Sequence, residues 1–279
     1  MLRLKLNSHL IIPLKKSVGK ILHITDTHLF ADDENNLLGV KTNASFAAVI
    51  DNIKKRAEHF DLIVATGDFV QDGSQAAYLK FAQTIKQFMA PCVWLAGNHD
   101  IHENMQYIFK QQGLPENKIV LLGEKWLIIM LNSQVVGETY GELSKQQLAF
   151  LTTSLQKYPD RFAMVFLHHH PLMSNCDWLD KHSLINHVEF INLINQLPQI
   201  KGVGWGHIHQ ITQQRLPHCL AFSTPSTCVQ FKPLSRDFSV ANDAPGWRVI
   251  ELKPEGHVDT AVYNLENNLF IPDLSQNGY

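Results

Sequence analysis

The sequence CVWLAGNHD, residues 92–100, changes from apolar to polar within a few residues. Its first four residues predict a short buried strand, which ends before Gly97. Asn98, His99 and Asp100 then place an amide, an imidazole and a carboxylate just beyond the carboxyl end of that strand. In open α/β sheets, ligands bind at the carboxyl ends of the strands. The stretch therefore predicts an α/β fold with a polar site at this position.

The segments before this stretch repeat the pattern. Apolar runs predict strands at 20–24 and 61–66, and helical periodicity predicts helices at 43–60 and 74–89. Thr42 or Asn43 would cap the first of these helices. Strands that are apolar throughout and alternate with helices are typical of a parallel sheet covered by helices on both faces.

The second half of the chain is less regular. Strands are expected at 119–123, 126–132, 162–167 and 202–205, and helices at 144–158 and in the second half of 180–197. Ser144 and Gln147 have the spacing of a capping box. From 213 to 262, strand patterns alternate with turns and suggest an antiparallel continuation. With no repeat or linker, we expect a single domain over residues 1–279, with residues 1–19 an irregular lead-in that could hold one edge strand.

Composition excludes several classes of function. The 279 residues carry a formal charge of −2, and no five consecutive residues carry like charge, so neither nucleic-acid nor anionic-membrane binding is indicated. No apolar run reaches the length of a membrane span or a signal peptide. The four cysteines are scattered, which favours a reducing compartment. We therefore expect a cytoplasmic protein with a small-molecule partner, for which a homodimer remains compatible with the sequence.

Fifteen histidines stand out in this composition, and several of them follow predicted strands. The polar residues at the ends of five apolar runs are Asp26 and His28, Asp68, Asn98 and His99, His168 to His170, and His207 and His209. The D-x-H and H-x-H spacings let two side chains of an extended segment point to the same side. Each pair alone has ordinary explanations, such as a helix cap or a surface histidine. The joint pattern is what indicates a site.

Carboxylate, imidazole and amide groups together suit a borderline divalent cation such as Mn, Fe or Zn. Seven candidate ligands are too many for one site that keeps an open position, but they suit two cations that share a carboxylate. Two cations about 3.5–4 Å apart form the clamp used for displacement at phosphorus. The sequence therefore predicts a dinuclear phosphoesterase centre. The remaining histidines, including His102, His182, His187 and His257, are expected to be ordinary surface or packing residues.

These blocks resemble, in order, the signatures of the calcineurin-like metallophosphoesterases. Further blocks resemble the bacterial class III 3′,5′-cyclic-AMP phosphodiesterases within that family. The matching segments are 24–30, 65–72, 97–100, 168–171, 206–209, 225–233 and 244–248.

The resemblance implies a four-layer α/β/β/α sandwich of two mixed β-sheets. Carried over by motif position, it implies one metal held by Asp26, His28 and His209, a second held by Asn98, His168 and His207, and Asp68 as the bridge. Among the three consecutive histidines, His168 matches the first histidine of the family motif and His169 is the alternative. His170 replaces a proline of that motif, which favours a pocket or packing role.

The resemblance also implies hydrolysis of cyclic AMP to 5′-AMP by a metal-bound hydroxide, with Fe, Mn or, less expectedly, Zn as the metals. His99 would be the catalytic residue beside the phosphate. The expected substrate-binding set is His28, Asp68, Asn98, His99, His168 and His209. Other phosphate esters, such as 2′,3′-cyclic nucleotides, glycerophosphodiesters or phosphomonoesters, form the alternative. A non-catalytic scaffold is a remote one.

Three expectations lie outside the ligand set. Asp72 and Asp100 would orient ligands or cap helices. The segment 226–231 has two interpretations of equal weight. It forms a core strand, or its polar residues shape the purine side of the pocket.

Overall fold

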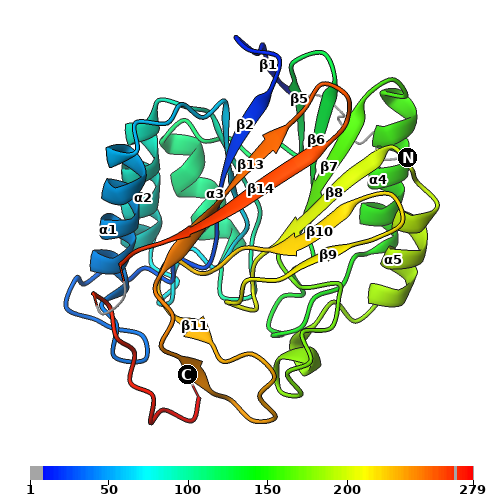
Figure 1. Ribbon diagram of the computed structural model, residues 1–279. Helices are drawn as coiled ribbons and strands as arrows, with labels where there is room; N and C mark the ends of the chain where they lie inside the picture. The colour runs from blue at the N-terminus through cyan, green and yellow to red at the C-terminus, as the bar shows by residue number, and fades with distance from the viewer. Residues whose placement is uncertain (1–8, 267–268, 279) are drawn as a thin grey trace.

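Two mixed β-sheets face each other at the centre of the molecule (Figure 1). The computed structural model describes residues 9–266 and 269–278. The five-stranded sheet has the order β14 (Val258–Asn264), β13 (Gly246–Leu252), β2 (Gly19–Ile24), β3 (Leu62–Ala65) and β4 (Cys92–Trp94). The seven-stranded sheet has the order β1 (His9–Ile12), β5 (Ile119–Leu122), β6 (Trp126–Met130), β7 (Phe162–Phe166), β8 (Ile200–Trp205), β10 (Leu220–Ser223) and β9 (Gln213–Arg215). A separate short pair joins β11 (Gln230–Phe231) to β12 (Val240–Ala241).

Helices cover the outer face of each sheet, so the molecule has four layers (Figure 1). The five-stranded sheet is covered by α1 (Thr42–Lys55), α2 (Gln75–Ile85) and α3 (His102–Gln111), with a 3₁₀ turn at Lys86–Phe88. The seven-stranded sheet is covered by α4 (Lys145–Lys157) and α5 (His187–Asn195), with a 3₁₀ turn at Leu179–His182. The predicted α/β/β/α sandwich of two mixed sheets is confirmed.

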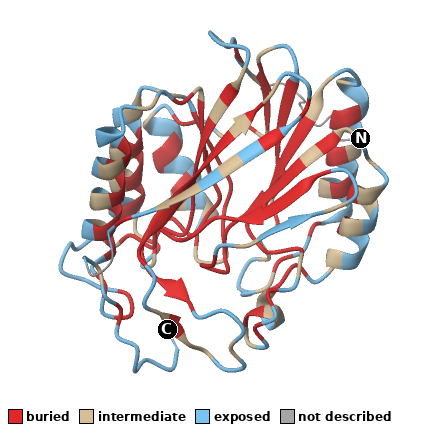
Figure 2. Ribbon diagram, viewed as in Figure 1, coloured by how far each residue is buried: buried red, intermediate tan, exposed pale blue. Residues whose placement is uncertain are grey.

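Three apolar cores hold these layers together. Phe81 and Phe109 pack between the first three helices and the five-stranded sheet. Val64 and Phe166 lie in the core between the two sheets, and Phe190 lies between α5 and the seven-stranded sheet. Figure 2 shows the consequence, since the sheets are largely buried whereas the helices expose their outer faces. Among the described residues, no helix has the length and apolarity needed to cross a membrane.

Strand direction places the polar motifs. The strands β2, β3 and β4 run parallel, as do β6, β7, β8 and β10. The carboxyl ends of β2, β3 and β4 therefore meet at one edge, and those of β7 and β8 meet at the edge of the other sheet. The two sheets present these edges to the same end of the molecule.

Residues 9–12 of the lead-in form the edge strand for which the sequence allowed. Four details differ from the sequence-based expectations. The helix α3 was not expected, and β10 pairs with β8 in parallel, although the pairs β9–β10, β11–β12 and β13–β14 are antiparallel as expected. Neither expected cap closes α1, because the hydroxyl of Thr42 donates to the carbonyl of His28 instead. At α4, Ser144 caps Gln147 as expected, but the Gln147 side chain accepts from the Asn132 amide.

His23 and Arg248 are buried polar side chains between the sheets. His23 on β2 lies 2.9 Å from the hydroxyl of Thr66 and 2.6 Å from that of Thr224. Arg248 on β13 donates to the carbonyl of Ser223 at 2.6 Å and lies over the Phe222 ring at 4.7 Å. These contacts join the sheets through polar groups that have partners. Unpaired, such groups would cost folding free energy.

Acid stability should depend on His23. Burial, and then the charge of Arg248, lowers the pKa of His23 to about 3. As the pH falls below about 6.5, the ordinary pKa of histidine, His23 becomes protonated in the unfolded chain but stays neutral in the folded chain. The stabilisation is thus complete above about pH 6.5 and is lost towards pH 3. We expect the melting temperature, measured by circular dichroism, to fall less between pH 6.5 and pH 4 in His23→Gln than in the parent protein. An equal loss in both proteins would contradict this.

Candidate active site

All seven predicted ligands lie together where the carboxyl ends of five strands meet. Asp26 and His28 follow β2, Asp68 follows β3 and Asn98 follows β4, whereas His168 follows β7 and His207 and His209 follow β8. Six of the seven are buried, and Asn98 is half-buried. The side chains thus come from both sheets and form two groups with a carboxylate between them.

The first group consists of Asp26, His28 and His209. The Nε2 atom of His209 lies 3.5 Å from Asp26 Oδ1 and 3.2 Å from His28 Nε2. One ligand atom from each residue falls within 4.8 Å of the other two. This spacing lets all three groups contact one cation.

The second group contains Asn98, His168 and His207. The Nε2 atom of His168 lies 3.1 Å from Asn98 Oδ1 and 3.2 Å from His207 Nδ1. An amide oxygen and two imidazole nitrogens therefore converge on one point.

Asp68 lies between the groups. Its Oδ2 atom is 3.2 Å from His168 Nε2 and 3.8 Å from His28 Nε2. Its Oδ1 atom accepts a hydrogen bond from the His99 amide at 2.9 Å. One carboxylate thus faces a histidine of each group, which is the arrangement that a bridging ligand needs.

His99 lies beside the cluster and is half-buried. Its ring centroid is 4.9 Å from that of His28, edge to face. Its backbone amide contacts Asp68, so the imidazole is carried at the edge of the cluster. A side chain in this position can reach a group bound over the two ligand sets.

Five of the seven candidate ligands have a positive φ angle: Asp26, His28, Asp68, His207 and His209. A left-handed backbone is uncommon outside glycine and often accompanies functional sites. Two glycines make room for the carboxylates. A Cβ atom on Gly97 would overlap Asp68 Oδ1, and one on Gly206 would overlap Thr25 and approach Asp26.

Hydrogen bonds on the far side of three imidazoles fix their ring orientations. His168 Nδ1 donates to the carbonyl of Thr66 at 2.6 Å, and His209 Nδ1 donates to that of Val229 at 2.8 Å. His28 Nδ1 lies 2.7 Å from the Gln71 amide oxygen. Such partners keep Nε2 directed into the cluster. Sequence reasoning assigned no role to Gln71, although it lies inside the 65–72 block.

The electrostatics keep both carboxyl groups ionised. Burial raises the pKa of Asp26, but the charge and hydrogen bond of His209 outweigh burial and lower it. Burial also opposes ionisation of Asp68, yet His168 and the neighbouring imidazoles hold its pKa well below the ordinary value. Conversely, Asp68 overcomes the burial of His168 and raises the pKa of that imidazole to about 9. The site stabilises paired opposite charges and so suits cations.

The chemistry of the donor set supports a metal centre. Among the described residues, His169 Nε2 and His207 Nε2 are buried and lack a hydrogen-bond partner, whereas His207 Nδ1 is the atom that faces His168. Buried polar atoms without a partner are costly and call for an explanation. With the carboxylates, the amide and the other imidazoles, they form a donor set that fits borderline divalent cations.

His169 is close enough to remain an alternative ligand. Its ring lies 4.8 Å from that of His207, and a ligand atom of each falls within 4.8 Å of one on His168. Its Nδ1 atom, however, lies 2.8 Å from the Ser133 hydroxyl. His168 Nε2 lies 3.2 Å from Asp68 Oδ2 and 3.1 Å from Asn98 Oδ1, so the distances favour His168.

The segment 226–231 supports the ligand loops from behind. The hydroxyl of Ser226 donates to the carbonyl of Asp26 at 2.8 Å, and the amide of Thr227 donates to that of Thr25. All six residues are buried. A supporting role for this segment was not foreseen from the sequence.

Asp100 and Asp72 have structural contacts. Asp100 accepts from the amides of Gly97 and Phe69, and from the Tyr78 hydroxyl. Asp72 accepts from the amides of Ala31 and Ser74 at the start of α2. Both positions agree with the expected orienting and capping roles.

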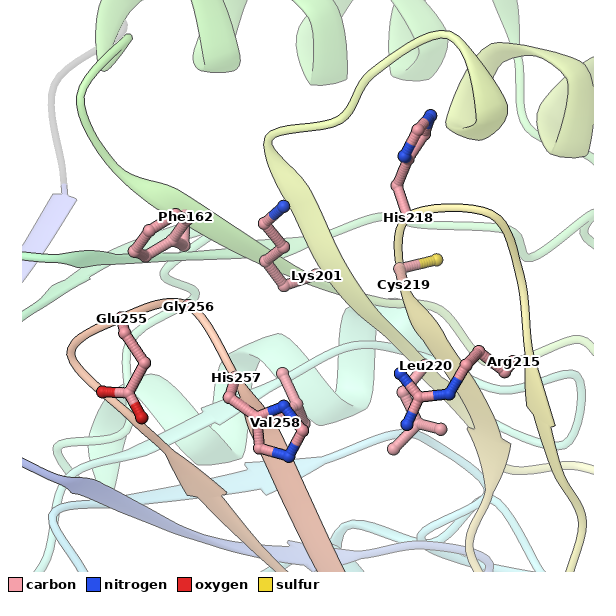
Figure 3. A pocket seen from close by; sticks show the side chains of 10 residues that line it. All are labelled: Phe162, Lys201, Arg215, His218, Cys219, Leu220, Glu255, Gly256, His257 and Val258. Carbon is pink, nitrogen blue, oxygen red and sulfur yellow. The ribbon is translucent and has the colours of Figure 1, made fainter.

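The pocket in Figure 3 lies elsewhere. It has a volume of about 280 Å³ and includes Phe162, Lys201 and the Glu255–Val258 turn. Phe162 begins β7 and Lys201 lies at the start of β8, so this pocket is at the opposite strand ends from the histidine cluster. It shares no residue with the cluster.

Comparison with known proteins now identifies the family. The sequence model of the family described as calcineurin-like phosphoesterase matches residues 19–211. The chain belongs to this family. The match includes the strand ends that carry all seven candidate ligands.

Curated relatives are similar along nearly the whole chain. A protein of Escherichia coli (strain K12), named 3′,5′-cyclic adenosine monophosphate phosphodiesterase CpdA, is 46% identical over 93% of this chain and 94% of its own length. A protein of the same name from Vibrio vulnificus (strain CMCP6) is 43% identical over 95% of this chain and 97% of its own. The similarity therefore extends beyond the family blocks into the C-terminal strands.

Solved structures share the fold at low identity. A dimetal phosphatase from Danio rerio has a TM-score of 0.60 at 14% identity and covers 89% of this chain and 99% of its own. GAP50, described as the anchor in the inner membrane complex of Plasmodium, has a TM-score of 0.62 at 14% identity. The match covers 94% of this chain and 90% of GAP50. One is named a phosphatase and the other an anchor, so the fold alone does not give the activity.

Proposed function

We propose that this phosphoesterase hydrolyses 3′,5′-cyclic AMP to 5′-AMP with two divalent cations. The observation that carries the proposal is the complete ligand set in a chain that is 46% identical to a named cyclic AMP phosphodiesterase over 93% of its length. A protein retained only as a scaffold would be expected to lose ligands. Here a ligand-type side chain stands at every expected position, which argues against that alternative.

The residues divide between the two cations. Asp26, His28 and His209 would hold one, and Asn98, His168 and His207 the other, with Asp68 shared. The donor set of oxygen and imidazole nitrogen suits Fe or Mn, with Zn also compatible.

When bound, the two cations polarise the phosphoryl oxygens and lower the pKa of water towards about 7. The chain's own contribution is to position the groups. His99 stands at the edge of the cluster, where it would donate a proton to the ribose 3′ oxygen as the P–O3′ bond breaks and water oxygen bonds to phosphorus. The substrate-binding residues would be His99 and the ligands His28, Asp68, Asn98, His168 and His209.

Steady-state kinetics with a panel of substrates test the proposal. We expect the Mn²⁺-reconstituted protein to show its highest kcat/KM on cyclic AMP among cyclic AMP, 2′,3′-cyclic AMP, a glycerophosphodiester and a phosphomonoester. Chelation should remove the activity and Mn²⁺ should restore it. A higher kcat/KM on another substrate would overturn the cyclic AMP assignment in favour of a broader phosphoesterase.

We place this activity in the cytoplasm with a small cyclic nucleotide as partner. The four cysteines are free and buried, which supports a reducing compartment.

A further inference from the structure

The two histidines of the 206–209 block each lie against a flat ring from another segment. The Phe231 ring stacks on His209 with centroids 4.4 Å apart and planes 16° apart. The His170 ring stacks on His207 at 5.6 Å and 20°. His207 and His209 belong to different ligand groups. Each group therefore has a stacked ring of its own.

Phe231 is held firmly in place. It is 1% exposed and meets Trp178 edge to face at 5.0 Å. Its amide donates to the carbonyl of His209 at 3.1 Å, and the nearby Val229 carbonyl accepts from His209 Nδ1. Stacking and hydrogen bonds from one segment therefore fix the plane of the His209 imidazole.

His170 is held by a different anchor. Its Nε2 atom lies 3.2 Å from Asp180 Oδ1. The same carboxylate accepts from the Ser174 amide at 2.8 Å and the Ser174 hydroxyl at 2.7 Å. The ring beneath His207 is therefore tied to the 174–180 loop, and Trp178 of that loop contacts the Phe231 ring behind His209.

Such support matters because His207 and His209 have φ angles of 69° and 46°. A left-handed backbone is strained for a residue with a side chain and persists only where the surroundings hold it. A supporting contact beside a ligand typically contributes about 10–100-fold to metal affinity. The two rings are thus placed to act on the two groups separately.

We propose that Phe231 and His170 are positioning residues that each set mainly the affinity of one cation site, Phe231 through His209 and His170 through His207. This proposal rests on the ligand assignment of the proposed function. The sites should then be separable by single substitutions behind the ligands.

Mn²⁺ titration of the metal-free protein tests the first half of the proposal. We expect Phe231→Leu and His170→Leu each to weaken one of the two sites about 10-fold by calorimetry. Phe231→Tyr and His170→Phe keep a flat ring and should restore most of the affinity. Phe190→Leu makes the same exchange in the distant helix core and should leave both affinities unchanged. Circular dichroism verifies that each variant is folded.

Two ligand-deletion backgrounds test this division between the sites. In His209→Ala, only the Asn98–His168–His207 site should bind tightly, and His170→Leu should weaken it about 10-fold while Phe231→Leu leaves it unchanged. In His207→Ala, only the Asp26–His28–His209 site should bind tightly, and Phe231→Leu should weaken it while His170→Leu leaves it unchanged. Equal weakening by both leucine variants in one background would overturn the proposal, as would no weakening by either. Because the readout is Mn²⁺ binding, a failure to hydrolyse cyclic AMP would appear separately.

Discussion

Asp68→Asn is expected to remove nearly all phosphoesterase activity while leaving the protein folded. The substitution keeps an oxygen that can accept from the His99 amide but removes the negative charge that faces both His28 and His168. The shared carboxylate would help hold both cations, whose stabilisation of transition-state charge is worth several kcal/mol, or about 10²–10⁴ in rate. We expect kcat to fall by about this factor and the Mn²⁺ stoichiometry to fall from two to one or none.

Asp72→Asn provides a matched control in the same loop. Asp72 accepts from the backbone amides of Ala31 and of Ser74, the residue before α2, and is not one of the proposed ligands. This variant should retain most of the activity and both cations. A kcat in Asp68→Asn equal to that of the parent protein would contradict the assignment of Asp68 as the shared carboxylate.

His99→Ala is expected to lower kcat on cyclic AMP by about 10²–10⁴-fold, the usual contribution of a positioned general acid. His99 is not among the proposed ligands, so Mn²⁺ affinity should stay within about threefold of the parent. The measurement is kcat for cyclic AMP beside a Mn²⁺ titration of the same preparation.

The leaving group distinguishes the role of His99. A nitrophenyl phosphodiester departs as a stable phenolate and needs little help from an acid, whereas the ribose 3′ oxygen needs a proton. The loss in His99→Ala should therefore be much smaller on the nitrophenyl substrate. An equal loss on both substrates would assign His99 to charge stabilisation, and a loss of Mn²⁺ binding would make it a ligand.

The strands and the site were predictable because the deciding signals are local. Runs such as Phe162–Leu167 are apolar on both faces, as buried parallel strands must be. The D-x-H and H-x-H motifs follow such runs, and parallel strands bring their carboxyl ends together. The pattern along the chain was enough to predict an α/β fold and the meeting point of the polar residues, whereas the four-layer arrangement was implied by the family resemblance.

The features that were missed depend on contacts distant in sequence or on a weak local signal. In α3 only Met105, Ile108 and Phe109 are buried, which is a short apolar pattern for a helix. Thr42 looked like a helix cap, yet its hydroxyl bonds to His28, 14 residues earlier. The stacking of Phe231 on His209 joins residues whose proximity follows from the loop after β10, which no spacing rule describes.

The origin of the ligands has a consequence for assembly. In the proposed assignment, each cation takes ligands from both sheets: Asp26 and His28 with His209 in one site, and Asn98 with His168 and His207 in the other. In a chain with its sheets apart, neither sheet would carry all the ligands of either site. Cation binding is therefore thermodynamically linked to the docking of one sheet on the other, and the stabilisation grows with the logarithm of the free cation concentration above Kd. Metal supply would then govern the stability of the folded protein as well as the rate of the reaction.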